Sequence, residues 1–193
     1  MSHKVKHPIN IPALALVGWS GSGKTTLMET LISIFSARGL RVAALKHDAH
    51  DFSIDHEGKD SWRFTAAGAR RTIICSPHKL AVVEQLDQSV VMEDLLKRFS
   101  GGMDLVLVEG YKGGDIPKIE VYRPEHKDEL LCMHTEQYPG ILAIATDAEK
   151  ENLPQLQVPI LPLNESQQIA DFIAQNFILK QDGVVIHEAK GRV

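Results

Sequence analysis

The sequence is poor in cysteine, in aromatic residues and in long apolar runs. Its two cysteines, Cys75 and Cys132, lie far apart without a Cys-x-x-Cys pair, so we expect buried thiols rather than a disulfide or a metal pair. No apolar stretch approaches the roughly 18 residues of a membrane span. The basic residues at the N-terminus are not followed by the apolar segment of a secretory signal. These absences predict a cytoplasmic protein.

An excess of basic residues is also absent. The 193 residues include 25 acidic and 21 basic ones, which gives a net charge of -4 and argues against binding to nucleic acid or to a membrane surface. A hydrophobic content of 44% in a chain without repeats suits one domain with a substantial core. We therefore expect a single domain over residues 1–193, with its core at residues 10–179.

The most informative segment is a glycine-rich loop near the N-terminus. It matches the phosphate-binding pattern Gly-x-x-x-x-Gly-Lys-[Ser/Thr], and a second hydroxyl residue follows it. Glycines let backbone N–H groups converge on phosphate oxygens, because no Cβ blocks the approach. In such a loop Lys24 reaches the β- and γ-phosphates, and the Thr25 hydroxyl is a Mg²⁺ ligand. The predicted nucleotide-binding residues here are Gly18, Trp19, Ser20, Gly21, Ser22, Gly23, Lys24, Thr25 and Thr26.

The sequence around this loop has the strand–loop–helix order that the motif requires. Residues 9–17 form an apolar run typical of a strand, and residues 24–38 have helical spacing of apolar side chains. Gly39 lies where a helix C-cap favours glycine, and residues 40–46 predict a second strand. Two strands joined by a helix are expected to be parallel. The pattern predicts an α/β fold of the P-loop NTPase type, with three layers and a mostly parallel central sheet.

The remaining elements extend this prediction. An antiparallel hairpin is expected at residues 70–75 and 80–86, at an edge of the sheet. Further strand-like runs and helices are predicted as follows: strands at 104–110, 117–122, 129–133, 140–145 and 158–161, and helices at 60–69, 90–99 and 165–179.

A polar loop rich in histidine and aspartate follows the second predicted strand. Ligand crevices of open parallel sheets lie at the carboxyl ends of the strands, so Asp48 is a candidate to bind Mg²⁺ directly or through water. The alternative is a solvated loop whose acids cap the next helix. The histidines of this loop, His47, His50 and His56, lack the tight spacing of a tetrahedral metal site.

The nearly continuous apolar run at residues 104–110 predicts a central strand covered on both faces. Glu109 at its carboxyl end is expected to face Mg²⁺, and Gly110 lets the chain pass close to the γ-phosphate. A carboxylate turned to solvent is the alternative for Glu109. Asp104 lies about 17 Å away at the other end of the strand and is expected to be structural.

A second acid, Asp147, follows the predicted strand at residues 140–145. It is well placed to accept hydrogen bonds from the ring N–H and exocyclic amine of guanine. A helix N-cap is an equally plausible role for Asp147.

Five ordered segments together resemble the molybdopterin-guanine dinucleotide biosynthesis adaptor family, MobB. They are GWSGSGKTT at 18–26, KHDAHDF at 46–52, GKDSWRF at 58–64, DLVLVEGYK at 104–112 and PKIEVYR at 117–123. The resemblance extends from Leu14 to Phe177. It leaves the N-terminal extension and the C-terminal tail uncovered, and no full Asn-Lys-x-Asp guanine motif is present.

The resemblance implies a homodimer that binds GTP with Mg²⁺ and hydrolyses it weakly. It also implies a partner, the molybdenum cofactor guanylyltransferase that joins GMP to molybdopterin, and possible contact with molybdopterin itself. Lys24, Asp48 and Glu109 are then the catalytic candidates, with Thr25, Asp48 and Glu109 at the metal, and the sequence identifies no water-positioning residue. Charge for the transition state has three candidates, which are Lys59, Arg63 and Lys112.

Two other functional classes stay open. One is an ATP-dependent small-molecule synthetase of the dethiobiotin-synthetase type, which requires a substrate pocket of its own. The other is a metal-insertion GTPase that uses the histidine-rich loop.

Overall fold

The computed structural model describes residues 12–47, 52–126 and 129–178. These residues fall into two compact units, divided after His47 and before Leu96. The larger unit holds the glycine-rich loop. The smaller unit holds the predicted hairpin.

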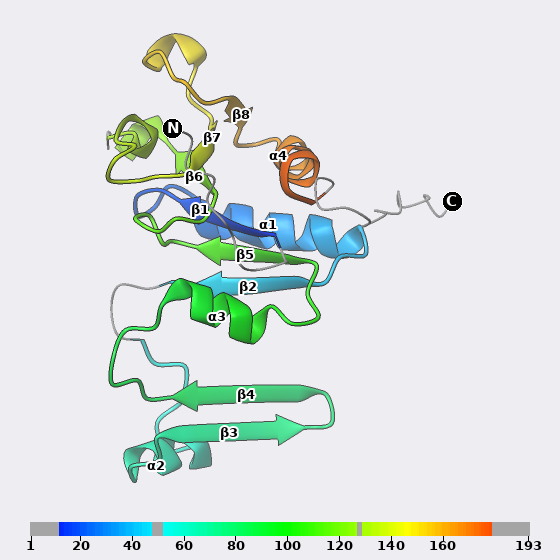
Figure 1. Cartoon of the computed structure of the whole chain (residues 1–193), viewed down its shortest axis with the longest axis vertical. Helices are drawn as coiled ribbons and strands as arrows, with labels where there is room; N and C mark the ends of the chain where they lie inside the picture. Colours follow the sequence, from blue (N-terminus) through cyan, green and yellow to red (C-terminus); the bar gives the residue numbers. More distant parts are fainter. Residues whose placement is uncertain (1–11, 48–51, 127–128, 179–193) are drawn as a thin grey trace. The chain divides into compact units, whose positions relative to one another are not determined.

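A six-stranded sheet forms the centre of the larger unit (Figure 1), with the strand order β2-β5-β1-β6-β7-β8. Every neighbouring pair in it is parallel. The strands are β1 Ala13–Val17, β2 Val42–Lys46, β5 Leu105–Glu109, β6 Lys118–Tyr122, β7 Ile141–Thr146 and β8 Ile160–Pro162. Their carboxyl ends therefore share one edge, and the structure confirms the predicted α/β fold.

Two helices cover the core of this sheet. Helix α1 spans Lys24–Ala37, and α4 spans Ser166–Ile173 and continues as a π-helical turn over Ala174–Ile178. The two helices lie side by side (Figure 1). Leu31 and Phe35 of α1 are fully buried, and burying a side chain of this size contributes about 1.5–3 kcal/mol each. Within the described residues, no helix is both long and apolar enough to span a membrane.

Strand β1 lies between β5 and β6 because both of its faces are apolar. All residues from Leu14 to Val17 are fully buried, as expected for a central parallel strand. The register pairs Leu16 with Glu109 of β5 and Val17 with Glu120 of β6. The glycine-rich loop starts at the end of β1, so it starts between the carboxyl ends of β5 and β6.

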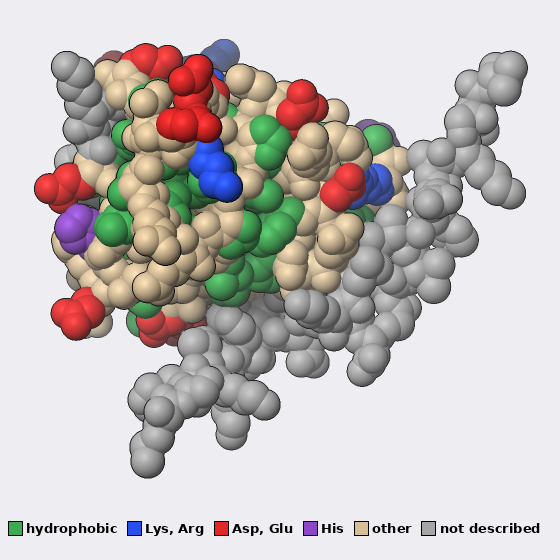
Figure 2. Space-filling model, turned by 90° about the horizontal axis from the view of Figure 1, so that it is seen from above, with side chains coloured by type: hydrophobic (Ala, Val, Ile, Leu, Met, Phe, Trp, Pro, Cys, Tyr) green, Lys and Arg blue, Asp and Glu red, His purple; other side chains and the backbone are tan. Residues whose placement is uncertain are grey.

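The surface seen from above carries mixed side chains. Figure 2 shows acidic groups at several separate places, with hydrophobic and polar side chains between them. A continuous basic surface, which nucleic-acid binding requires, is not a feature of this face among the described residues.

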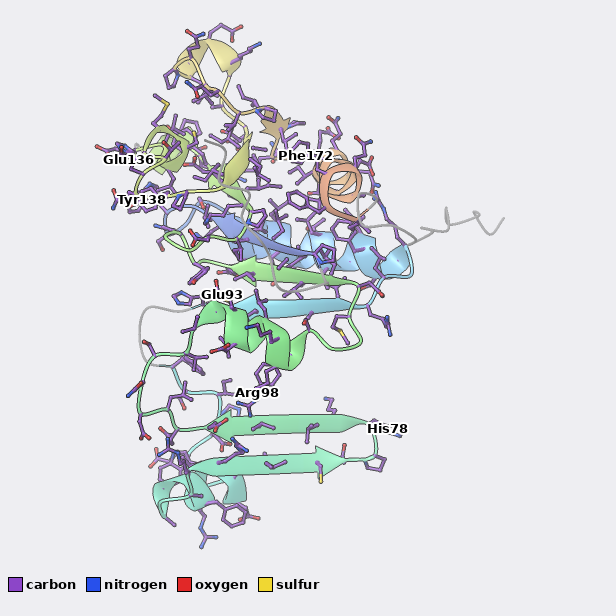
Figure 3. The ribbon with its side chains drawn as sticks, in the orientation of Figure 1. His78, Glu93, Arg98, Glu136, Tyr138 and Phe172 are labelled. Atoms are coloured by element: carbon purple, nitrogen blue, oxygen red, sulfur yellow. The ribbon has the colours of Figure 1, made fainter. Side chains whose placement is uncertain are left out.

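The smaller unit contains helix α2 (Asp60–Ala66) and a separate two-stranded antiparallel sheet. Its strands are β3 Arg71–Ser76 and β4 Lys79–Glu84, and His78 lies at the turn between them (Figure 3). The predicted hairpin is confirmed, but it forms its own sheet rather than an edge of the parallel one. Helix α3, Met92–Phe99, follows it along the chain.

The prediction that Cys75 is buried is wrong, because this thiol is exposed, whereas Cys132 is partly buried. Cys75 lies opposite Leu80, and Ile73 lies opposite Val82 on the same face of the hairpin. Ile73, Leu80 and Val82 are also exposed. A two-stranded sheet has too few strands to bury both of its faces.

The strand predicted at residues 129–133 is also wrong. The structure has a 3₁₀ helix, η2, over Leu131–Met133, and similar short turns are η1 Pro124–His126 and η3 Lys150–Asn152. The carboxylate of Glu120 explains the difference. It accepts hydrogen bonds from the backbone N–H groups of Leu131 at 2.7 Å and Cys132 at 2.8 Å, so these groups do not pair with a neighbouring strand.

Candidate nucleotide-binding site

The glycine-rich loop connects β1 to α1 at the carboxyl edge of the sheet. Gly18 begins the loop with φ of 152°, and a Cβ at this position would lie 2.3 Å from the carbonyl oxygen of Val121. Only glycine fits this approach to β6. The loop ends at Lys24, the first residue of α1. The first N–H groups and the dipole of this helix therefore favour an anion at the loop.

Lys24 lies over the loop and bonds to it. Its ammonium group donates to the carbonyl oxygen of Trp19 at 2.6 Å and to Ser22 Oγ at 3.5 Å. Burial lowers the pKa of Lys24, and the charges of Lys112 and Lys46 lower it further, while Glu109 opposes the shift. Lys24 and two neighbouring lysines thus place three positive charges near one carboxylate, and this excess of positive charge favours an incoming anion.

Thr25 and Glu109 meet at the start of α1 and the end of β5. The Thr25 hydroxyl lies 3.1 Å from each carboxylate oxygen of Glu109. Gly110 has φ of 89°, and a Cβ there would lie 2.7 Å from the carbonyl oxygen of His47, so the chain turns sharply just after Glu109. A hydroxyl and a carboxylate side by side are the hard oxygen donors that Mg²⁺ prefers.

Several other predicted residues lie outside the described residues, make contacts of their own, or belong to the smaller unit. Asp48 and His50 lie outside the described residues. His47 is exposed and its ring contacts that of Tyr111 at 5.1 Å between centroids. Among the residues that the structure does describe, no group of three or more His, Cys, Asp or Glu could hold a metal ion. Lys59 and Arg63 belong to the smaller unit.

Asp104 lies at the opposite end of β5 from Glu109, as predicted. It accepts hydrogen bonds from the backbone N–H of Arg41 at 2.7 Å and from the guanidinium at 2.8 and 2.9 Å. These bonds lower the pKa of Asp104 to about 2. The structural role expected for Asp104 is confirmed.

Asp147 follows β7 and pairs with an arginine that sequence reasoning did not select. Its carboxylate accepts a hydrogen bond from Arg123 Nη1. The N-cap of the next helical turn is Glu149, so the helix-cap alternative for Asp147 is wrong. Arg123 could have been found from its position, since it directly follows β6 at the ligand edge of the sheet.

Trp19 and Lys112 form a second contact that the sequence did not reveal. The Lys112 ammonium lies 3.8 Å from the centroid of the Trp19 ring, a cation–π contact. Trp19 Nε1 also donates to the carbonyl oxygen of Glu129 at 2.8 Å. Trp19 therefore contacts two segments outside the loop, one at Lys112 and one at Glu129. Ser20, Gly21 and Thr26 of the loop are exposed.

A comparison with known families matches residues 13–147 to the family MobB, "Molybdopterin guanine dinucleotide synthesis protein B". The chain is 40% identical over 164 residues to a molybdopterin-guanine dinucleotide biosynthesis adapter protein of Haemophilus influenzae, covering 84% of this chain and 88% of that protein. It is 35% identical over 178 residues to the adapter protein of the same description from Escherichia coli, covering 90% and 97%.

Solved structures give the same result for the fold. The crystal structure of a molybdopterin-guanine biosynthesis protein B has a TM-score of 0.65 and 31% identity, covering 84% of this chain and 98% of that one. The glycine-rich loop, Thr25 and Glu109 all fall within the range matched by the family model.

Proposed function

Because the chain belongs to the MobB family, we propose that it is an adapter in the synthesis of molybdopterin guanine dinucleotide that binds GTP with Mg²⁺ and hydrolyses it weakly. The observation that carries the proposal is the meeting of Thr25 and Glu109 at the N-terminus of α1, beside the Lys24 ammonium. Family membership supports the adapter role. GTP, rather than ATP, is the part of the proposal that rests on the family alone, because the Asp147 carboxylate, predicted from the sequence to read the guanine base, is already bonded to Arg123.

The chemistry of the site follows from its donors. Lys24 exchanges the carbonyl oxygen of Trp19 for phosphate oxygens, which are better acceptors for an ammonium group. Thr25 and Glu109 would hold Mg²⁺, with Asp48 as the third predicted ligand. When bound, the cation would neutralise part of the phosphate charge, and the N–H groups of the loop would stabilise the remaining negative charge. The sequence identifies no residue that would position the attacking water, and this fits a slow hydrolysis better than a fast one.

The partner that this function requires is the guanylyltransferase that joins GMP to molybdopterin, and molybdopterin itself is a possible ligand. The mixed surface of Figure 2 supports a protein partner better than a nucleic acid. A cytoplasmic location accompanies this proposal.

A homodimer is the further part of the proposal. It is supported by the exposed apolar face of the β3–β4 hairpin, which contains Ile73, Leu80 and Val82. Apolar faces of this kind are often covered by a second chain. Sedimentation equilibrium tests it: Ile73→Lys should shift the protein toward monomer, whereas Lys79→Ala at the start of β4 should not.

The experiment that tests the nucleotide site is calorimetric titration of GTP and ATP, each with and without Mg²⁺. The wild-type chain should prefer GTP and bind it more tightly with Mg²⁺. Glu109→Gln should lose most of the Mg²⁺-dependent gain, while Asp104→Asn, at the other end of the same strand, should keep it. Equal binding of ATP would support a synthetase instead, and equal Mg²⁺ dependence in Glu109→Gln would exclude the metal assignment.

A further inference from the structure

Arg123 lies at the phosphate loop on the side away from the Thr25–Glu109 pair. Strand β1 has β5 on one side and β6 on the other. Glu109 ends β5, whereas Arg123 directly follows β6. The predicted Mg²⁺ site and Arg123 therefore lie on opposite sides of the strand that leads into the loop.

The side chain of Arg123 returns toward the start of α1. A Cβ placed at Gly23 would lie 3.5 Å from Arg123 Nε and 3.8 Å from Nη2. The edge of the guanidinium that carries Nε and Nη2 thus faces the residue just before Lys24. This edge presents two parallel N–H groups, the arrangement with which arginine binds two phosphate oxygens at once.

The other end of the guanidinium is held by Asp147. Tyr122 and Thr146 are partners in the β6–β7 register, so Arg123 and Asp147 follow at the next position of each strand. Nη1 donates to the Asp147 carboxylate, and the two side chains are only 32% and 19% exposed. One carboxylate therefore fixes the direction in which the Nε–Nη2 edge points.

We propose that Arg123 binds the α- and β-phosphates of the nucleotide, and that Asp147 is the positioning residue that orients it. This assignment rests on the proposed nucleotide site. A triphosphate whose terminal end is at the Thr25–Glu109 side of the loop has its nucleoside end at the β6–β7 side, where Arg123 lies. Arg123 then contacts phosphates that GTP and GDP share, and it does not distinguish the two.

Nucleotide binding by calorimetry tests the assignment of Arg123. Arg123→Gln should lower the affinities for GTP and GDP by the same factor, about tenfold or more, because a charged bidentate contact is lost. The Mg²⁺ dependence of binding should be unchanged. Arg123→Lys should recover part of the loss. Arg41→Gln is the matched control, because it removes another arginine paired with a carboxylate, at the far edge of the same sheet. It should bind as the wild type does.

The role of Asp147 is tested by a double-mutant cycle. Asp147→Asn should lower the affinities for GTP and GDP because Arg123 is no longer oriented. In the Arg123→Gln background, Asp147→Asn should cause no further loss of affinity. Additive losses would overturn the positioning role and assign Asp147 to another contact.

The failure of this proposal differs from the failure of the nucleotide site itself. If the wild-type chain binds GTP and Arg123→Gln binds GTP and GDP equally well, or loses GTP alone, the Arg123 assignment is overturned and the nucleotide site stands. If the wild-type chain binds neither GTP nor ATP, both are overturned.

Discussion

Two lysines of the larger unit, Lys24 and Lys118, carry their charge in very different surroundings. Lys118 begins β6, is fully buried, and donates to the carbonyl oxygens of Gly114, Ile116 at 2.9 Å and Pro139 at 2.5 Å. Lys24 is only partly buried and donates to one carbonyl at normal distance, with a second, longer contact to a hydroxyl. An ammonium group has three donors, and at Lys118 all three have carbonyl partners.

Lys118 has the surroundings of a lysine that serves the structure, and Lys24 has those of a lysine that binds a ligand. Lys118 joins the loop after β5 to the loop before β7, and it has the partners that a buried ammonium needs. Lys24 lies among other cations, and its bonds are to the loop that a ligand would occupy. A buried ammonium group with all of its acceptors supplied by the fold serves the structure, whereas an ammonium group supplied with acceptors only in part is ready for an external anion.

The largest expected effect is on ligand affinity at Lys24. Lys24→Met should lower the affinity for GTP at least about 100-fold, since it removes charged hydrogen bonds to phosphate. Its free energy of unfolding should stay within about 1 kcal/mol of wild type, because the substitution also removes repulsion from Lys112 and Lys46. Calorimetry and urea unfolding measure the two quantities, and unchanged GTP affinity would exclude Lys24 from the site.

The opposite result is expected at Lys118. Lys118→Met should lower the free energy of unfolding by roughly 3 kcal/mol, because three carbonyl oxygens lose a buried charged donor. The GTP affinity of the folded fraction should be unchanged. Urea unfolding followed by circular dichroism measures the loss, with Lys97→Met on α3 as a control at a lysine outside the parallel sheet. A loss no larger than that of the control would contradict the structural role.

A smaller effect concerns pH. Burial lowers the pKa of Lys118 to about 8 from the ordinary 10.5, so between these values the unfolded chain binds more protons than the folded one. The contribution of Lys118 to stability therefore rises with pH across that window and is constant below it. The difference in unfolding free energy between wild type and Lys118→Met should widen from pH 7.5 to pH 10. A constant difference would show that the pKa is not lowered.

The smallest effect sharpens the electrostatic side of the comparison. Lys112 is one cause of the lowered pKa of Lys24, after burial. Lys112→Met should raise that pKa toward its ordinary value, and NMR titration of labelled lysine side chains can follow it. The pKa of Lys118, whose shift is caused by burial, should not move. Equal shifts in both lysines would contradict this account.

Much of the fold and part of the site could be predicted because their signals are local. The glycine pattern identified the phosphate loop, and the apolar run before Glu109 identified β5 and its place beside β1. Contacts between distant segments gave no such signal. The sequence at Leu131 is typical of a strand, but the Glu120 carboxylate accepts the hydrogen bonds of its N–H groups. The direction of the Arg123 side chain is set by Asp147, which follows the neighbouring strand. The exposure of Cys75 follows from the separate two-stranded sheet of β3 and β4, which the spacing of the two cysteines does not reveal.

The indole of Trp19 gives the loop an optical property of its own. A cation 3.8 Å from the ring centroid and a hydrogen bond from Nε1 both act on its excited state. A ligand that displaces either one changes the emission of a fluorophore built into the phosphate loop. The sequence contains only one other tryptophan, Trp62, so Trp62→Phe yields a protein whose fluorescence follows its loop without any added label.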